Sequence, residues 1–326
     1  MRAFITGITG FVGSHLAEYL LTLPDMEVYG LARWRSPLDN LKNVIGKVKL
    51  LQGDLTDESS LRYCLNECKP DYVFHLAAQS YVQYSFRAPS ATLQANCIGT
   101  VNLLQSLRWL TDECGAPPVI HCCSSSEVYG QPNDDELPIR ETNPLRPASP
   151  YAVSKVCEDM LAYQYWLSWG LPIIRTRMFT HTGNRRGDVF VESNFAKQIA
   201  EIEAGIRPPV VYVGNLDSVR TFADVRDTVR AYWLLVNKCR HGEVYNIGGN
   251  RTMTVGKMLE YLISISKTKV DIAVDPARLR PSDVTMQIPC IDKFVSETGW
   301  KPEIPFEQTM ADLLDYWRGR VQPASV

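Results

Sequence analysis

Three glycines near the start of the chain limit its possible folds more than any other feature. Gly7, Gly10 and Gly13 lie directly between a short apolar segment, residues 3–5, and an amphipathic segment, residues 14–21. A strand that enters such a turn and leaves it as a helix lets the backbone approach a pyrophosphate, and the helix N-terminus supplies free N–H groups. Glycines also occur in ordinary turns, but this position between a strand and a helix favours a dinucleotide site.

Apolar and amphipathic segments alternate through the first 130 residues. Strands are expected at residues 27–31, 48–55, 71–80 and 118–123, and a helix is expected to begin at Asn96. This alternation is typical of a parallel sheet joined by right-handed crossovers. We therefore predict an α/β fold: a Rossmann-type, doubly wound parallel sheet with a smaller α/β substrate-binding lobe.

The pattern changes after residue 176, although the apolar segment at 243–249 should return to the first sheet as its last strand. We predict a dinucleotide-binding domain of residues 1–176 with 218–248. Residues 177–217 with 249–326 should form the second lobe. Since the sequence contains neither an internal repeat nor a low-complexity linker, this lobe is expected to be built from separate pieces of chain.

The end of the second predicted strand bears on the choice of dinucleotide. An enzyme that prefers NAD would place an acid there for the adenosine ribose, whereas this chain has Arg33 and Arg35 and no acid before Asp39. A guanidinium suits a 2′-phosphate, so the sequence favours NADP over NAD. The alternative is that both arginines lie on the solvated surface.

Hydroxyl and carboxyl groups follow the apolar run at 118–123. Ser124, Ser125, Ser126 and Glu127 stand at its end, and Tyr151 and Lys155 follow at helical spacing i and i+4, on one face if the segment is a helix. A lysine ammonium lowers the pKa of a neighbouring phenol, so the pair can exchange protons near neutral pH. We predict a site that moves a proton off a hydroxyl, with Glu127 available for a second proton.

Composition narrows the partners and the compartment. Thirty-four Lys and Arg against 36 Asp and Glu give a net charge of −2 without a charged tail, which argues against nucleic acid or a membrane surface as the main partner. The nine cysteines are expected to be reduced thiols of a cytoplasmic protein. The N-terminus leaves no room for a signal peptide before the glycines, and no metal site is expected, with Cys64 and Cys68 as the alternative.

The glycine loop, Ser125 and the Tyr151-x-x-x-Lys155 pair together resemble the extended short-chain dehydrogenase/reductases that modify nucleotide sugars, over nearly the whole chain. The motifs at residues 76–80, 124–130 and 181–187 are most similar to the branch of GDP-mannose 4,6-dehydratases and GDP-4-keto-6-deoxy-mannose reductases. The resemblance implies that Asp54 contacts the adenine and that Asn96 is a buried helix asparagine.

The resemblance also implies an activity. In a 4,6-dehydratase, Tyr151 would remove the proton of the sugar 4-hydroxyl, Ser125 would bind that oxygen, and Lys155 would lower the pKa of the tyrosine. Glu127 would remove the C5 proton of the 4-keto sugar, and Ser126 would assist the departure of water from C6. Glu127 favours the dehydratase because a reductase or a 4-epimerase does not need this base.

Alternatives remain open on sequence grounds. Glu127 could instead cap the following helix or pair with a surface cation. The chain could be the companion 4-keto reductase, a nucleotide-sugar 4-epimerase, or an NADP-binding scaffold without catalysis. Thr180 stands where the family usually has Asn. Residues 192–197 resemble the reductases, whereas residues 184–187 resemble the dehydratases.

The predicted site comprises three groups of residues. The catalytic group is Ser125, Ser126, Glu127, Tyr151 and Lys155. The cofactor group is Gly7, Thr9, Gly10, Phe11, Val12, Gly13, Arg33, Arg35, Asp54, Leu55, Leu76, Ala77, Ala78, Tyr151 and Lys155. The group for a nucleotide sugar, expected to be GDP-linked, is Gln79, Ser80, Ser125, Glu127, Thr180, Asn194, Lys197, Arg220 and Arg280. Arg220 and Arg280 are candidates for clamping the diphosphate. The family pairs two helices across a dimer, so a homodimer is expected, and a tetramer is possible.

Overall fold

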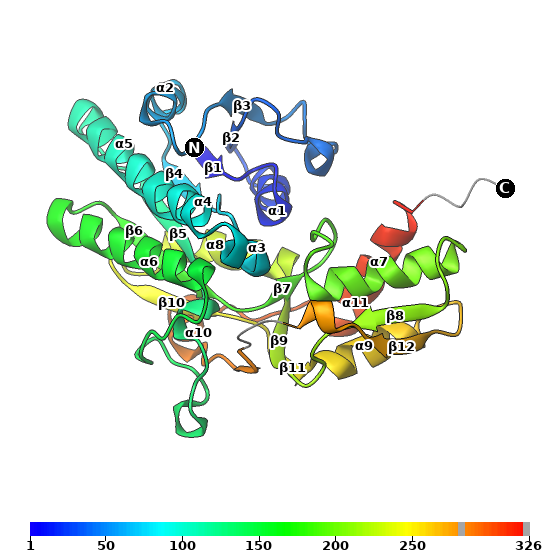
Figure 1. Ribbon diagram of the computed structural model, residues 1–326. Helices are drawn as coiled ribbons and strands as arrows, with labels where there is room; N and C mark the ends of the chain where they lie inside the picture. Colours follow the sequence, from blue (N-terminus) through cyan, green and yellow to red (C-terminus); the bar gives the residue numbers. More distant parts are fainter. Residues whose placement is uncertain (280–283, 322–326) are drawn as a thin grey trace.

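The computed structural model describes residues 1–279 and 284–321. Seven parallel strands form the main sheet (Figure 1), in the order β10-β6-β5-β4-β1-β2-β3. The strands are β1 Arg2–Thr6, β2 Glu27–Ala32, β3 Lys49–Gln52, β4 Tyr72–His75, β5 Val119–Ser125, β6 Ile173–Met178 and β10 Val244–Ile247. The strand order reverses between β1 and β4, the switch point at which a doubly wound sheet binds its ligands. The predicted fold class is confirmed, and the strand at 243–249 does return to the main sheet.

Helices cover both faces of this sheet. On one face, α1 Phe11–Leu20 and α8 Val225–Lys238 share a core with β1 and β10, and α10 Asp292–Thr298 adds to it. On the other face, α2 Glu58–Cys68, α5 Gly99–Cys114 and α6 Pro150–Trp169 pack over a second core. The strands are buried on both sides, which explains why they appear in the sequence as continuous apolar runs.

A second lobe lies beside the carboxyl ends of the main strands (Figure 1). Its helices α7 Val191–Glu203, α9 Val255–Ser264 and α11 Phe306–Arg318 enclose a separate core with the parallel pair β8 Val210–Val213 and β12 Asp271–Val274. Between the lobe and the main sheet lies a small sheet of β9 Val219–Asp224, β11 Arg251–Thr254, β13 Met286–Gln287 and β7 His181–Thr182. The predicted division into two domains stays a prediction.

Several elements differ from the sequence-based expectation. Asn96 does not begin a helix: it lies within a π-helical turn, Gln94–Ile98, that joins α4 Pro89–Leu93 to α5. The short helices α3 Val82–Arg87 and α4 were not expected, because each has too few residues to show a helical period. The helix α7 was also missed, since its polar residues obscured an apolar face that the lobe buries.

Within the described ranges, no helix combines the length and the apolar character needed to cross a membrane.

Candidate active site

One large cavity runs along the carboxyl ends of the main strands and continues into the second lobe. Its volume is about 1640 Å³. The loops after β1, β2, β3, β4 and β5 line one end, and residues of α7, β9 and β13 line the other. A ligand that fills this cavity would therefore touch both lobes.

The glycine loop forms the floor of the first end. Gly7 has a φ of +75°, and a Cβ there would lie 2.9 Å from the backbone nitrogen of Ala77. At Gly13 a Cβ would lie 2.2 Å from the carbonyl oxygen of Gly7. Helix α1 begins after Gly10 without a side-chain cap and without an acid in its first turn. Its N–H groups are thus available to a phosphate, and the loop fits the pyrophosphate of a dinucleotide.

Most of the predicted cofactor residues line this end of the cavity. They are Gly7, Thr9, Gly10, Phe11, Val12, Gly13, Arg33, Asp54, Leu55, Leu76, Ala77, Ala78, Tyr151 and Lys155. Arg35 is exposed and is not among the lining residues, so its role in cofactor binding stays a prediction. The chain turns after β2, where the Arg33 N–H donates to Ser36 Oγ at 3.2 Å, so that Arg33 and Ser36 rather than Arg35 border the cavity.

Helix α6 presents Tyr151 and Lys155 to the cavity. Ser149 caps the helix, its Oγ accepting the Ala152 N–H at 3.0 Å, and Pro150 occupies the first turn. Tyr151 is 9% exposed and shares a hydrogen bond with Ser125, which ends β5. Burial raises the pKa of Tyr151, while the Lys155 ammonium and the Ser125 hydrogen bond oppose that rise. The three residues predicted to act on one hydroxyl are therefore brought together.

The side chain of Lys155 is fixed by three hydrogen bonds. Its Nζ donates to the Cys123 carbonyl oxygen at 2.5 Å and lies 2.7 Å from both carboxylate oxygens of Glu158. Both side chains are almost fully buried. Burial would lower the pKa of Lys155, but Glu158, followed by Tyr151 and Cys123, raises it, and the pKa lies above its ordinary value. Glu158 was not anticipated from the sequence.

Glu127 and Ser126 stand in the short turn after β5. The Glu127 N–H donates to Ser125 Oγ at 3.2 Å, and its half-buried side chain lines the cavity. Ser126 is buried and donates through Oγ to Gln287 Oε1 at 2.9 Å. The Ser126 hydroxyl is thus engaged with β13, which leaves Glu127 as the group of this turn that is better placed to meet a substrate.

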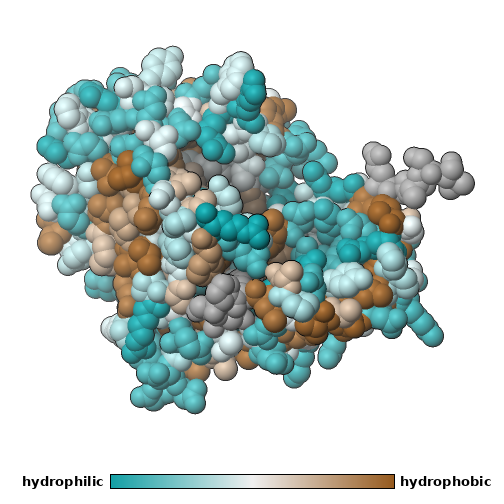
Figure 2. All heavy atoms as spheres, viewed as in Figure 1, coloured by the Kyte–Doolittle hydropathy of each residue, from teal (hydrophilic) through white to brown (hydrophobic). Residues whose placement is uncertain are grey.

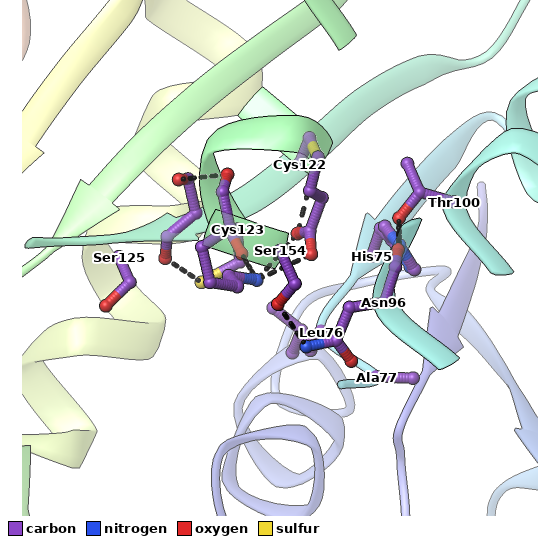
Figure 3. A network of polar contacts seen from close by, with 12 residues as sticks. His75, Leu76, Ala77, Asn96, Thr100, Cys122, Cys123, Ser125 and Ser154 are labelled. Atoms are coloured by element: carbon purple, nitrogen blue, oxygen red, sulfur yellow. Dashed lines mark hydrogen bonds and ion pairs between the residues drawn. The ribbon is translucent and has the colours of Figure 1, made fainter. Parts of the chain in front are cut away.

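A polar network ties the neighbouring loops together (Figure 3). Asn96 accepts the Gln79 N–H at 2.7 Å and donates to Ser154 Oγ at 2.8 Å, so that the π-helical turn is joined to both the β4 loop and α6. His75 bonds Thr100 Oγ1 through Nε2 at 2.9 Å. Since π-helical turns cluster at functional sites, Asn96 fits a role in holding this loop.

The predicted substrate residues divide into three sets. Gln79, Ser80, Ser125, Glu127, Thr180, Asn194 and Arg220 line the cavity. Lys197 binds Asp188 Oδ2 through Nζ at 2.6 Å and is not among the lining residues, so its role in substrate binding stays a prediction. Arg280 lies outside the described residues.

Arg220 and Gln79 are partly committed to the protein. Arg220 donates to the carbonyl oxygens of Val219 and Val284. The Gln79 side chain bonds Thr92 Oγ1 and the backbone of Tyr81.

Other lining residues stand outside the three predicted groups. Arg278 donates from Nη1 to Asn194 Oδ1 at 2.8 Å, two residues before the predicted Arg280. Gln287 is 2% exposed, and among the described residues its Nε2 has no hydrogen-bond partner. Arg186 faces Glu192 at 3.2 Å and lies 3.5 Å from the centre of the Phe190 ring. Only the charges of Arg186 and Arg278 gave a signal in the sequence.

The chain is similar to known proteins over nearly its whole length. The family model described as GDP-mannose 4,6 dehydratase matches residues 4–313. The chain is 34% identical over 322 residues to a GDP-6-deoxy-D-mannose reductase of Pseudomonas aeruginosa, covering 98% of each protein. It is 33% identical over 350 residues to a GDP-mannose 4,6-dehydratase of Vibrio cholerae serotype O1, covering 96% of this chain and 92% of the relative. These matches confirm the resemblance to that branch.

A solved structure is similar throughout its length. It is the structure of RMD from Pseudomonas aeruginosa complexed with NADPH, with a TM-score of 0.85 and 33% sequence identity. The match covers 98% of this chain and 99% of that one.

Proposed function

The chain belongs to the GDP-mannose 4,6-dehydratase family, and on that premise we propose that it converts a GDP-linked hexose to its 4-keto-6-deoxy form. One observation carries the choice of reaction: Glu127 lines the same cavity as Ser125 and Tyr151, and its N–H donates to Ser125 Oγ at 3.2 Å. Hydride transfer at a carbinol needs only the tyrosine, serine and lysine. A carboxylate beside them supplies the second acid–base group that loss of water requires.

The first proton transfer is assigned to Tyr151. As the phenolate, Tyr151 removes the proton of the sugar 4-hydroxyl and becomes the phenol, while Ser125 binds the same sugar oxygen. Lys155 opposes the effect of burial on the pKa of Tyr151 and so favours the phenolate. A bound nicotinamide dinucleotide supplies the hydride acceptor, and later the hydride donor, for this chemistry.

The second proton transfer is assigned to Glu127. Once C4 is a ketone, the C5 proton is acidic. The carboxylate takes this proton and then, as a carboxylic acid, protonates the C6 oxygen, which leaves as water. After C6 has been reduced, Glu127 delivers a proton drawn from solvent to C5. A half-buried carboxylate with access to the cavity suits a proton transfer that runs in both directions. Ser126 supports the geometry of the turn through Gln287 rather than by assisting the leaving water.

NADP is the proposed cofactor. Arg33 borders the cavity beside Ser36 at the end of β2, and Glu27, the acid of that strand, stands at the opposite end. A guanidinium there favours a 2′-phosphate. The similar structure with bound NADPH supports this choice.

Incubation with GDP-mannose and catalytic NADP, without added reductant, tests the proposal. We expect a 4-keto-6-deoxy product with no net change in NADPH absorbance. NADPH consumption only when a 4-keto sugar nucleotide is supplied would instead identify a 4-keto reductase. That second function is favoured by the 34% identity to a reductase over 98% of both chains.

A homodimer through α5 and α6 is also proposed. Hydrophobic residues gather on the surface over these helices (Figure 2). Val153 is 46% exposed and Leu167 64% exposed on α6, and Trp109 is exposed on α5. Exposed apolar surface of this kind marks association sites. Sedimentation at micromolar concentration should show a dimer, and a monomer would refute it.

The reducing cytoplasm is the proposed compartment. All nine cysteines are unpaired, and Cys64, Cys68 and Cys122 are buried. A thiol-rich chain of this kind is typical of reducing compartments. Fractionation of cells that express the tagged protein would test the assignment.

A further inference from the structure

Helix α6 carries two adjacent buried acids that have different partners. Glu158 is 1% exposed and Asp159 is not exposed at all. Asp159 binds two arginines of β6, with Oδ1 at 2.8 Å from Arg175 Nη1 and Oδ2 at 2.8 Å from Arg177 Nε. Among the cations of the described residues, Glu158 binds only Lys155, through both of its oxygens. The ion pairs of Asp159 join the helix to the sheet, whereas the Glu158–Lys155 ion pair lies at the proposed proton-transfer site.

The hydrogen bonds of Lys155 fix its position. An ammonium has three N–H donors. Glu158 accepts at 2.7 Å through each oxygen, and the Cys123 carbonyl oxygen on β5 accepts at 2.5 Å. The ammonium is therefore held between α6 and β5, one helical turn after Tyr151.

A lysine in this position needs a counter-ion to remain charged. Burial is the largest influence on the pKa of Lys155 and would lower it, yet the pKa lies above its ordinary value because Glu158 is the largest opposing influence. Buried lysines without such a partner lose their proton in or near the neutral range. A neutral lysine would no longer favour the Tyr151 phenolate.

The other titratable groups around this pair do not supply a replacement charge. Burial lowers the pKa of His75 and of His121 to about 3, so both rings are neutral at neutral pH. Burial raises the pKa of the Cys122 and Cys123 thiols and of Tyr232, and these groups are neutral as well. The remaining neighbours are Asp159, whose carboxylate binds Arg175 and Arg177, and the thiol pair Cys97 and Cys157. Cys97 lowers the pKa of Cys157 to about 7. Tyr151 and Cys123 also raise the pKa of Lys155, but less than Glu158 does.

We infer that Glu158 is a positioning residue, whose carboxylate keeps the buried Lys155 charged and fixed so that Tyr151 can act as the base. The inference rests on the proposed role of Tyr151 and not on the identity of the sugar. The Glu158 carboxylate touches the ammonium directly. Because Coulomb energy falls with distance, it favours the charged lysine more than it disfavours the more distant phenolate. The pKa of Tyr151 responds accordingly, with Glu158 a smaller influence than burial, Lys155 or Ser125.

A titration of the cofactor-free protein tests the inference without reference to activity. Lysine labelled with ¹³C at Cε is followed by NMR, and the Lys155 signal is assigned by its absence from Lys155→Met. In the wild type we expect Lys155 to stay protonated through pH 10.5, its ordinary pKa. In Glu158→Gln it should titrate at lower pH, and Glu158→Asp should restore most of the wild-type behaviour. A wild-type Lys155 that titrates below pH 10.5 overturns the inference even if the glutamine variant fails to fold.

Asp159→Asn is the matched control. It makes the same acid-to-amide change at the next residue and at the same burial. We expect a lower melting temperature, because Arg175 and Arg177 lose their counter-charge, and an unchanged Lys155 titration. If both variants shift Lys155 equally, Glu158 has no special role.

Kinetics separate this inference from the proposed function. Glu158→Gln should lower kcat for the first hydride step by about tenfold for each pKa unit by which Lys155 falls below the assay pH, with little change in KM. The alkaline limb of the pH–rate profile of Glu158→Gln should move to lower pH. A wild type that is inactive on every nucleotide sugar would refute the proposed function and leave the NMR result intact. An active wild type whose pH profile is unchanged by Glu158→Gln would refute the role of Glu158.

Discussion

The two ends of the cavity differ in whether backbone or side-chain atoms form them. The dinucleotide end is formed by backbone: a glycine loop, an uncapped helix N-terminus and the carboxyl ends of parallel strands. The substrate end is formed by side chains that already bind one another, such as Arg278 with Asn194 and Ser126 with Gln287. A backbone site tolerates almost no added atom, whereas a side-chain site can lose one contact and keep the others.

This difference predicts how each end responds to change. Substitutions of the glycines that form the dinucleotide end should act abruptly on binding. Each substitution at the substrate end should weaken substrate binding by the amount expected for the loss of one or two hydrogen bonds. The predictions that follow test this contrast, beginning with the largest effect.

Gly13→Ala should weaken NADPH binding by about 100-fold or more, since the new Cβ would meet the Gly7 carbonyl oxygen at 2.2 Å and displace the loop. Isothermal titration calorimetry measures the change. Gly46→Ala is the control, because a Cβ at Gly46 meets nothing within 4 Å. Equal affinities of Gly13→Ala and the wild type would show that the loop does not hold the pyrophosphate.

Low pH should destabilise the main sheet, which carries His75 and His121, before it destabilises the second lobe. Burial lowers the pKa of His75 and His121 to about 3, below the ordinary 6.5, so the unfolded chain binds more protons between these values. The contribution of the two neutral histidines to the free energy of unfolding is complete above about pH 6.5 and falls as the pH drops toward 3. By pH 5 the loss is about 2 kcal/mol for each histidine.

Urea denaturation at pH 7.5 and pH 5 measures this loss. Residues 191–217 and 249–326 contain no histidine, so hydrogen exchange at pH 5 should open β4 and β5 before α9. A free energy of unfolding that is the same at both pH values would contradict the prediction.

Arg278→Ala should raise KM for the nucleotide sugar by about tenfold, as expected for one charge-assisted hydrogen bond, and should leave kcat nearly unchanged. Steady-state kinetics measures both constants. Lys197→Ala is the control, because Lys197 binds Asp188 and does not line the cavity. The assignment of Arg278 is wrong if the two variants behave alike.

Arg33→Ala should give the smallest effect. Arg33 is exposed, so loss of its contact with a 2′-phosphate should weaken NADPH binding by about fivefold and leave NADH binding unaltered. Fluorescence titration with both dinucleotides measures the selectivity. Arg35→Ala is the matched control, and an equal loss in both variants would indicate only general attraction between charges.

The same contrast explains what the sequence could predict. The glycine loop, Ser125, Tyr151 and Lys155 follow from local spacing, because strand, turn and helix place them whatever the rest of the chain does. Arg278, Gln287 and Glu158 depend on packing between segments far apart in the chain, or between a helix and the strand beneath it. Arg278 and Glu158 stand two and three residues from the predicted Arg280 and Lys155, but spacing alone gives neither a role.

The helix boundaries show the same limit. The spacing of Tyr151 and Lys155 predicted a helical segment, and Ser149, Pro150 and Gly170 mark the ends of α6 locally. It did not predict the π-helical turn at Asn96, because that turn depends on hydrogen bonds to Gln79 and Ser154. Local chemistry therefore predicts regular elements, and tertiary contacts produce the exceptions that shape the site.

Glu127 is the residue on which the choice between dehydration and simple reduction depends. Rapid mixing of Glu127→Gln, loaded with NADP, with GDP-mannose tests that choice most directly, with absorbance at 340 nm followed alongside product release. If Glu127 moves the C5 proton, bound NADP should be reduced and remain reduced, and no 4-keto-6-deoxy product should appear. Wild-type turnover by the Glu127→Gln variant would contradict the account.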